Sequence, residues 1–131
     1  MPYSYTSGLG NVGAYQVSGK PFVTSSITVP GSASAPVEVA FPTVTRSITV
    51  RNDAGSTALR VGFSAHGTIG SENNYYFTLA AGASWQEDIK VESLFLLSHA
   101  AGAGTATVIA GLTGIPTSTI TENFSGSVGV G

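Results

Sequence analysis

The chain has 131 residues, a formal net charge of −2 and no cysteine. Charged residues make up only 9% of it, against roughly 25% in an average soluble domain. The missing cysteines exclude disulfides and thiolate metal sites. The 5 basic residues are dispersed along the chain, which argues against nucleic-acid binding.

The shortage of charge has three explanations, which the sequence separates. A membrane-spanning helix needs about 20 apolar residues, whereas the long apolar runs here are residues 94–97 and 108–110. Disorder does not fit most of the chain, because β-branched and aromatic residues recur at strand spacing. The composition therefore favours a small β domain covered by partners in an assembly. A small uncharged domain that acts alone is the alternative.

Residues 1–21 are predicted to form an arm that precedes the folded domain. They are rich in Tyr, Ser and Gly and show no sustained period. Tyrosine combines apolar area with a polar tip and is enriched at interfaces. The arm either lies across a neighbouring subunit or folds back on its own domain. Because its first eight residues lack a basic and an apolar region, we predict no secretory signal and synthesis in a cytoplasm.

The segments that follow alternate with a period of two, which is typical of half-buried strands. In the first, Val23, Ile27 and Val29 share one face. The predicted strands are residues 22–29, 37–41, 45–51, 58–65, 75–79, 85–91, 93–98 and 105–112. Residues 117–131 are again rich in Ser, Thr and Gly, which predicts a second arm.

Residues 45–65 are predicted to be the central hairpin of the domain. Two alternating segments flank the polar, Gly-containing stretch 52–57, as in an antiparallel hairpin. Arg46 shares a face with Ile48 and Val50, so we expect an internal ion pair between Arg46 and Glu87.

About eight strands with turn signals every 8 to 12 residues predict an all-β fold, an antiparallel β-sandwich or jelly roll. The folded domain is expected over residues 22–116, with extended N- and C-terminal arms. The predicted core consists of Ile27, Val29, Val39, Phe41, Ile48, Val50, Leu59, Val61, Phe63, Phe77, Leu79, Trp85, Ile89, Phe95, Leu97, Val108, Ala110 and Leu112.

No motif for catalysis, cofactor binding or metal binding has the context that its chemistry needs. Residues 8–13 match GxGxxG but lack the strand before it and the helix after it. Ser64 and His66 lie in a Gly-flanked segment without the geometry of a nucleophile elbow. His66 and His99 show no metal-ligand spacing with the scattered carboxylates. We therefore predict no enzyme, no cofactor and no metal, and we interpret the sequon at Asn123 as coincidental.

Several ordered segments resemble small virion structural proteins of tailed, especially aquatic, bacteriophages, in particular capsid decoration (cement) proteins. The resemblance lies in residues 8–19 (GLGNVGAYQVSG), 45–52 (TRSITVRN), 59–64 (LRVGFS), 75–79 (YYFTL), 87–90 (EDIK), 94–96 (LFL) and 108–113 (VIAGLT). These are packing patterns that cover most of the chain.

The resemblance implies a β-sandwich on the outer capsid surface that binds the major capsid protein and itself, often as a trimer. Nucleic acid and membrane are not expected partners. On this hypothesis the N-terminal arm contacts the capsid or a neighbouring copy, through Tyr3, Tyr5, Leu9, Val12 and Tyr15.

Two other interpretations remain at this point. The same architecture would serve a tail component such as a baseplate, fibre or adaptor piece. A carbohydrate-binding module would use exposed aromatic rings, for which Tyr75, Tyr76 and Trp85 are the candidates. The register of Trp85 with Ile89 and Val91 indicates a core position instead.

Overall fold

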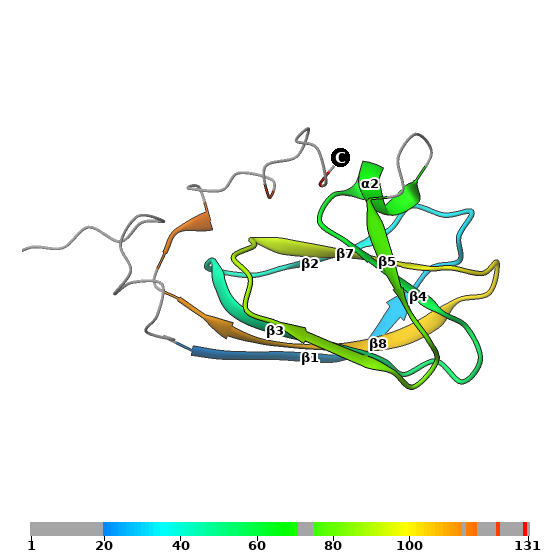
Figure 1. Ribbon diagram of the computed structural model, residues 1–131, viewed down its shortest axis with the longest axis horizontal. Coiled ribbons are helices and arrows are strands. Elements are labelled where there is room, and N and C mark those ends of the chain that lie inside the picture. The colour runs from blue at the N-terminus through cyan, green and yellow to red at the C-terminus, as the bar shows by residue number, and fades with distance from the viewer. Residues whose placement is uncertain (1–19, 71–74, 114, 118–122, 124–129, 131) are drawn as a thin grey trace, which may run out of the picture.

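The computed structural model describes residues 20–70, 75–113, 115–117, 123 and 130. Its strands form two antiparallel four-stranded sheets that pack face to face (Figure 1). Sheet A has the order β1 (Lys20–Val29), β8 (Gly104–Leu112), β3 (Thr45–Asn52), β6 (Ser84–Glu87). Sheet B has the order β2 (Val37–Ala40), β7 (Ser93–Ser98), β4 (Leu59–Gly62), β5 (Tyr76–Leu79). The predicted antiparallel β-sandwich is confirmed.

The hydrophobic core lies between the two sheets, where alternate residues of each strand point inward. The side chains of Ile48, Val50, Val61 and Val108 are fully buried there. Most other predicted core residues are buried as well. Five are partly buried and pack against the core, namely Ile27, Phe63, Phe77, Trp85 and Ile89.

The prediction for β7 chose the wrong face. Leu94 and Leu96 belong to the core cluster, whereas Phe95 and Leu97 had been expected there. Phe95 is half-buried and lines a pocket. Leu97 is fully buried. The helix α2 (Ala65–Ile69) packs against β4 and β7. A continuous apolar run has no polar residue to mark its outer face, so its parity was ambiguous.

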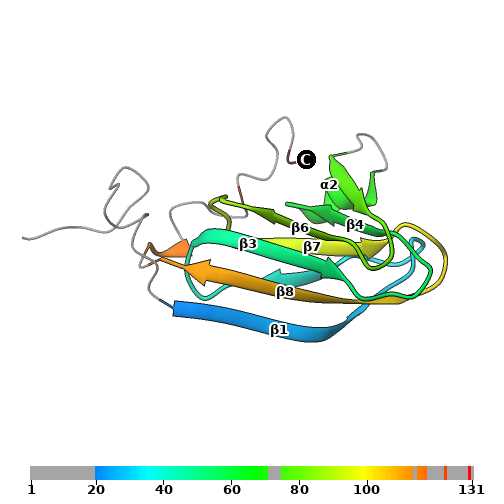
Figure 2. The same ribbon diagram turned by 60° about the horizontal axis from the view of Figure 1, so that its bottom comes forward.

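The hairpin predicted over residues 45–65 is wrong, because β3 and β4 belong to different sheets. β3 pairs with β8 and β6, whereas β4 pairs with β7 and β5. Alternation reports which face of a strand is buried, not which strand is its neighbour. The polar stretch between them crosses from one sheet to the other, as Figure 2 shows for β3 and β4.

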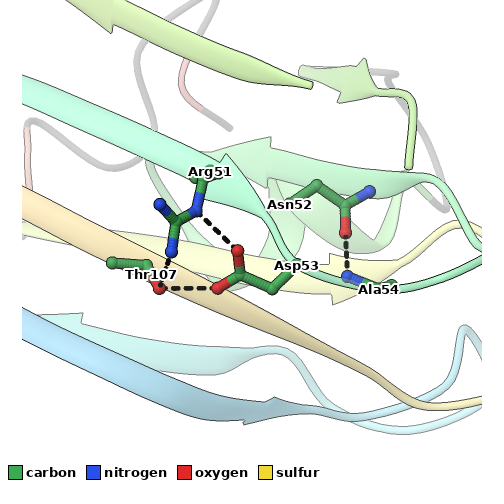
Figure 3. A network of polar contacts seen from close by, with 5 residues as sticks. All are labelled: Arg51, Asn52, Asp53, Ala54 and Thr107. Atoms are coloured by element: carbon green, nitrogen blue, oxygen red, sulfur yellow. Dashed lines mark hydrogen bonds and ion pairs between the residues drawn. The ribbon is translucent and has the colours of Figure 1, made fainter. Parts of the chain in front are cut away.

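A buried asparagine fixes this crossing. The Asn52 side chain is 1% exposed and its Nδ2 donates to the carbonyls of Thr57 at 2.9 Å and Leu79 at 3.0 Å. Its Oδ1 accepts from the Ala54 amide at 3.0 Å (Figure 3). The amide therefore links the end of sheet A to sheet B and satisfies backbone groups that the turn leaves unpaired.

A bulge in β3 moves Arg46 off the buried face, where an internal ion pair with Glu87 had been expected. The register with β8 shifts between Thr45 and Ser47, so one extra residue is inserted there. As a result Thr45 takes the buried position, and the side chains of both Arg46 and Glu87 are exposed. The insertion resets the period-two pattern on which the prediction rested.

A second irregularity, in β1, reverses the predicted facing of Val23. The register with β8 shifts between Thr24 and Ile27, and Ser26 has a φ of 55°. Ile27 packs against the core, but Val23 is 64% exposed. The two residues that were expected to share a face lie on opposite faces.

The remaining differences concern short segments. Residues 65–69 form the helix α2, where a strand end and a loop were expected, and Ser64 caps it by accepting from the Gly67 amide at 3.0 Å. The strand expected over 85–91 ends at Glu87. β1 begins at Lys20, two residues before the expected start.

Candidate interaction surfaces

The residues predicted to bind a partner, Tyr3, Tyr5, Leu9, Val12 and Tyr15, lie outside the described residues. Candidate surfaces must therefore be sought on the sandwich. Two faces are available, the outer side of sheet A and the outer side of sheet B.

The outer side of sheet A carries an uncharged row of residues that crosses all four strands. Across the sheet, Val23 of β1 is paired with Ile109 of β8, and Ile109 is paired in turn with Thr49 of β3. Thr49 is also paired with Gln86 of β6, which completes the row. Val23 is 64% exposed and Ile109 is 44% exposed, so neighbouring strands present an apolar pair to solvent. Directly opposite residues in a sheet have side chains in contact range.

A shallow hollow of about 400 Å³ lies along this row. Its lining consists of Lys20, Pro21, Ser47, Thr49, Gln86, Ile109, Ala110 and Gly111. The small residues Ser47 and Gly111 account for its depth, because they project little beyond the backbone. The lining includes one cation, Lys20, at the start of β1.

A compact polar network closes the other end of the same face (Figure 3). The Arg51 Nε donates to Asp53 Oδ1 at 2.6 Å, and the Thr107 hydroxyl donates to Asp53 Oδ2 at 2.6 Å. These bonds, first from Thr107 and then from Arg51, hold the pKa of the Asp53 carboxyl below its usual value. The positive charge of Arg51 is thus neutralised by Asp53, so it adds no net charge beside the row Val23, Ile109, Thr49 and Gln86.

The outer side of sheet B is organised around Arg60 of β4. Its guanidinium carbon lies 4.5 Å from the centre of the Tyr76 ring, within the range of a cation–π contact. The Nε donates to His99 Nδ1 at 3.0 Å, and Nη1 donates to the carbonyl of Ile69 at 2.9 Å. Arg60 therefore fastens the end of α2 to the sheet.

This arrangement separates the aromatic residues considered for sugar binding. The Trp85 ring lies 4.7 Å from the Phe77 ring, centre to centre, in a tilted contact, and it packs against the core, as its register had indicated. Tyr76 is the neighbour of Phe77 on β5, so its side chain points to the opposite face of the strand. Tyr76 and Trp85 do not form one platform.

A pocket of about 410 Å³ lies beside α2. Its lining includes Ser64, His66 and two carboxylates, Glu38 and Glu92. The Ser64 hydroxyl donates to the carbonyl of Val130 at 2.7 Å, so it is committed to the C-terminal part of the chain. Among the described residues, no three His, Asp or Glu side chains gather as a metal site would require.

The C-terminal part of the chain is fastened to this side of the sandwich at Asn123. This residue is 3% exposed and its Oδ1 accepts from the Glu92 amide at 2.6 Å. Its Nδ2 donates to the carbonyls of Ser93 at 2.6 Å and Phe63 at 3.1 Å. The side-chain amide thus bridges the start of β7 and the end of β4. The sequence offered no signal for this role beyond a sequon, whose buried Asn123 is already fully bonded.

Comparisons with known proteins give little guidance. No protein-family model matches the chain, and no curated protein matches its sequence. Among solved structures, it is similar to a chain of the Bacillus endospore appendages, described as a novel family of disulfide-linked pili. The two share 16% identity with a TM-score of 0.40, over 74% of this chain and 95% of the other. A likeness this distant assigns neither a family nor a function.

The structure is thus a small all-β fold, and its described residues assemble no catalytic constellation that meets the geometric requirements of a known reaction class. In the described part of the chain, no helix has the length and apolarity needed to cross a bilayer.

Proposed function

We propose that the protein is a structural protein of a phage virion, a capsid decoration (cement) protein rather than an enzyme. In this role it binds the outer capsid surface as a homo-oligomer, with a trimer favoured, and stabilises contacts between major capsid subunits. The resemblance of its packing segments supports this role. The observation that carries it is the uncharged row Val23, Ile109, Thr49 and Gln86 on the outer side of sheet A, which suits a lasting protein contact better than free exposure to solvent.

The physical demands of the role agree with the composition. A capsid shell must resist the pressure of packaged DNA, and a small protein that bridges subunits adds contact area where the shell would open. Symmetry repeats each modest contact many times, and linked contacts gain strength through effective concentration. In a chain with only 9% charged residues, the charge-poor surface would then be largely covered in the assembled particle.

A tail component is the second candidate, because the same sandwich and uncharged row would serve a baseplate, fibre or adaptor. A carbohydrate-binding module is the weaker alternative. Its aromatic platform would have to form without Trp85, which packs against Phe77.

The test is the copy number of the protein in purified virions of the phage that encodes it, measured by quantitative mass spectrometry against the major capsid protein. Capsid decoration predicts on the order of hundreds of copies per particle, and a tail position predicts roughly six or twelve, following the symmetry of each structure. Absence from purified virions would refute both locations. Binding to a glycan array that is lost in Tyr76→Ala would favour the carbohydrate-binding module.

A further inference from the structure

The outer side of sheet A has the properties of an acceptor surface. Its central row, Val23, Ile109, Thr49 and Gln86, carries no charge and includes two exposed apolar side chains in direct opposition. The hollow along the row spans all four strands, so an extended chain could lie across it. We call this row and hollow the sheet A groove.

The chemistry of the first nineteen residues matches this groove. Residues 1–19 contain no Asp, Glu, Lys or Arg, and they carry three tyrosines together with Leu9, Val12 and Val17. Apart from Lys20 at the start of β1, the groove has no charged residue, so it accepts such a segment without stranding a charge in its central row. Tyrosine rings can bury their apolar faces against Val23 and Ile109 while their hydroxyls stay within reach of Thr49 and Gln86.

The segment joins the sandwich at Lys20, the first residue of β1. Lys20 precedes Pro21, and a residue before proline is restricted to extended conformations. Lys20 accordingly belongs to β1, which is an edge strand of sheet A, so the segment before it starts at the border where a second copy can approach. Nineteen extended residues reach about 60 Å, nearly twice the length of about 33 Å of the ten-residue strand β1.

From these observations we infer that residues 1–19 of one copy bind the sheet A groove of a second copy. The contact is heterologous, because the arm of each copy meets a different surface on the next. Repeated around an axis it closes a ring, which is consistent with the trimer in the proposed function. The inference rests on the proposed role as an assembly subunit, but it does not depend on the kind of particle.

Photo-cross-linking between isotopically distinct copies tests this contact in the full chain. Unlabelled protein carries a photo-reactive benzophenone amino acid at Leu9 or, separately, at Tyr15. It is combined in urea with ¹⁵N-labelled protein that lacks the photo-reactive group, and the two are dialysed together before irradiation. We call the unlabelled copies light and the ¹⁵N-labelled copies heavy. We expect cross-links that join peptides from residues 1–19 of light copies to peptides of heavy copies that contain Thr49, Gln86 or Ile109.

Exposed positions provide matched variants of the labelled acceptor. Ile109→Lys places a charge in the groove, and we expect the heavy–light yield to fall about tenfold, since a contact loss of 1.4 kcal/mol is tenfold in affinity. Ile69→Lys is the control, because Ile69 is 42% exposed, close to the 44% of Ile109, but lies on α2 beside sheet B. Unchanged urea midpoints would show that both variants fold.

Three results would overturn the inference. Cross-links within light copies alone would mean that each arm binds its own domain. Heavy–light cross-links that map elsewhere, or that Ile109→Lys leaves unchanged, would place the arm on another surface. A monomer at all concentrations without cross-links would exclude the contact. None of these measures virion copy number, so the failure of this contact and the failure of the proposed function are distinguishable.

Discussion

Replacing Asn123 tests whether the C-terminal part of the chain belongs to the fold. The side-chain amide makes bonds of 2.6 Å to the Glu92 amide, 2.6 Å to the Ser93 carbonyl and 3.1 Å to the Phe63 carbonyl. At about 1 kcal/mol net for each bond, with an added penalty for buried groups left unpaired, Asn123→Ala should lower the free energy of unfolding by about 2–4 kcal/mol. Urea denaturation followed by Trp85 fluorescence measures this loss.

Backbone conformation contributes separately at this position. Asn123 has a φ of 53°, in the left-handed region that asparagine and glycine adopt more readily than alanine. Asn123→Gly removes the same amide without that strain, so it should be less destabilised than Asn123→Ala. A loss below about 0.5 kcal/mol in both variants, the size of an ordinary surface effect, would refute the reasoning.

Five further substitutions, arranged in three tests, probe the packing and charge of the sandwich in the same denaturation assay. Leu96→Ala should cost about 2–5 kcal/mol because it leaves a core cavity, whereas Ile109→Ala on the exposed face should cost less than about 1 kcal/mol; equal losses would contradict the burial pattern. Gly31→Ala drives a Cβ into the backbone of residue 101 and should cost about 1–3 kcal/mol, while Gly102→Ala, with nothing within 4 Å, should change little. Similar losses at both glycines would contradict the close approach. Asp53→Asn tests the depressed pKa: the folded carboxylate stabilises the protein above its ordinary pKa of 3.8, and this contribution is lost as pH falls below that value. The stability difference between the wild type and Asp53→Asn should therefore shrink on acidification; a difference that stays constant or grows would contradict the assigned bonds.

The sequence predicted the class of fold because alternation is a direct consequence of a strand with one buried face. It predicted most of the core for the same reason, as the buried side chains of Ile48, Val50 and Val61 illustrate. It could not predict the partners of β3 and β4, since pairing depends on contacts between strands far apart in the chain. The two bulges changed the faces of Arg46 and Val23, because a single inserted residue reverses the parity beyond it.

The candidate surfaces were less accessible to sequence reasoning. The sheet A groove depends on residues from four strands whose register the sequence does not specify. The alternation in residues 105–112 correctly left Ile109 out of the predicted core. The sequence did not give the register of β1 with β8, which sets Ile109 opposite Val23. Asn123 fastens strands that lie about thirty and sixty residues away from it, a long-range role without a local signature.

The strand order of sheet A also has a consequence for how the protein is made. β8 lies between β1 and β3, although among the described strands it is the last to leave the ribosome. Until Gly104–Leu112 has been synthesised, residues 21–29, which carry no charge, lack their neighbour in the sheet. Unpaired uncharged strands are prone to aggregate during synthesis. Chains that end before Gly104 should therefore sediment with the insoluble fraction of a cell extract, while the full chain stays in the supernatant. Recovery of such shortened chains in the supernatant would show that β1 does not need β8.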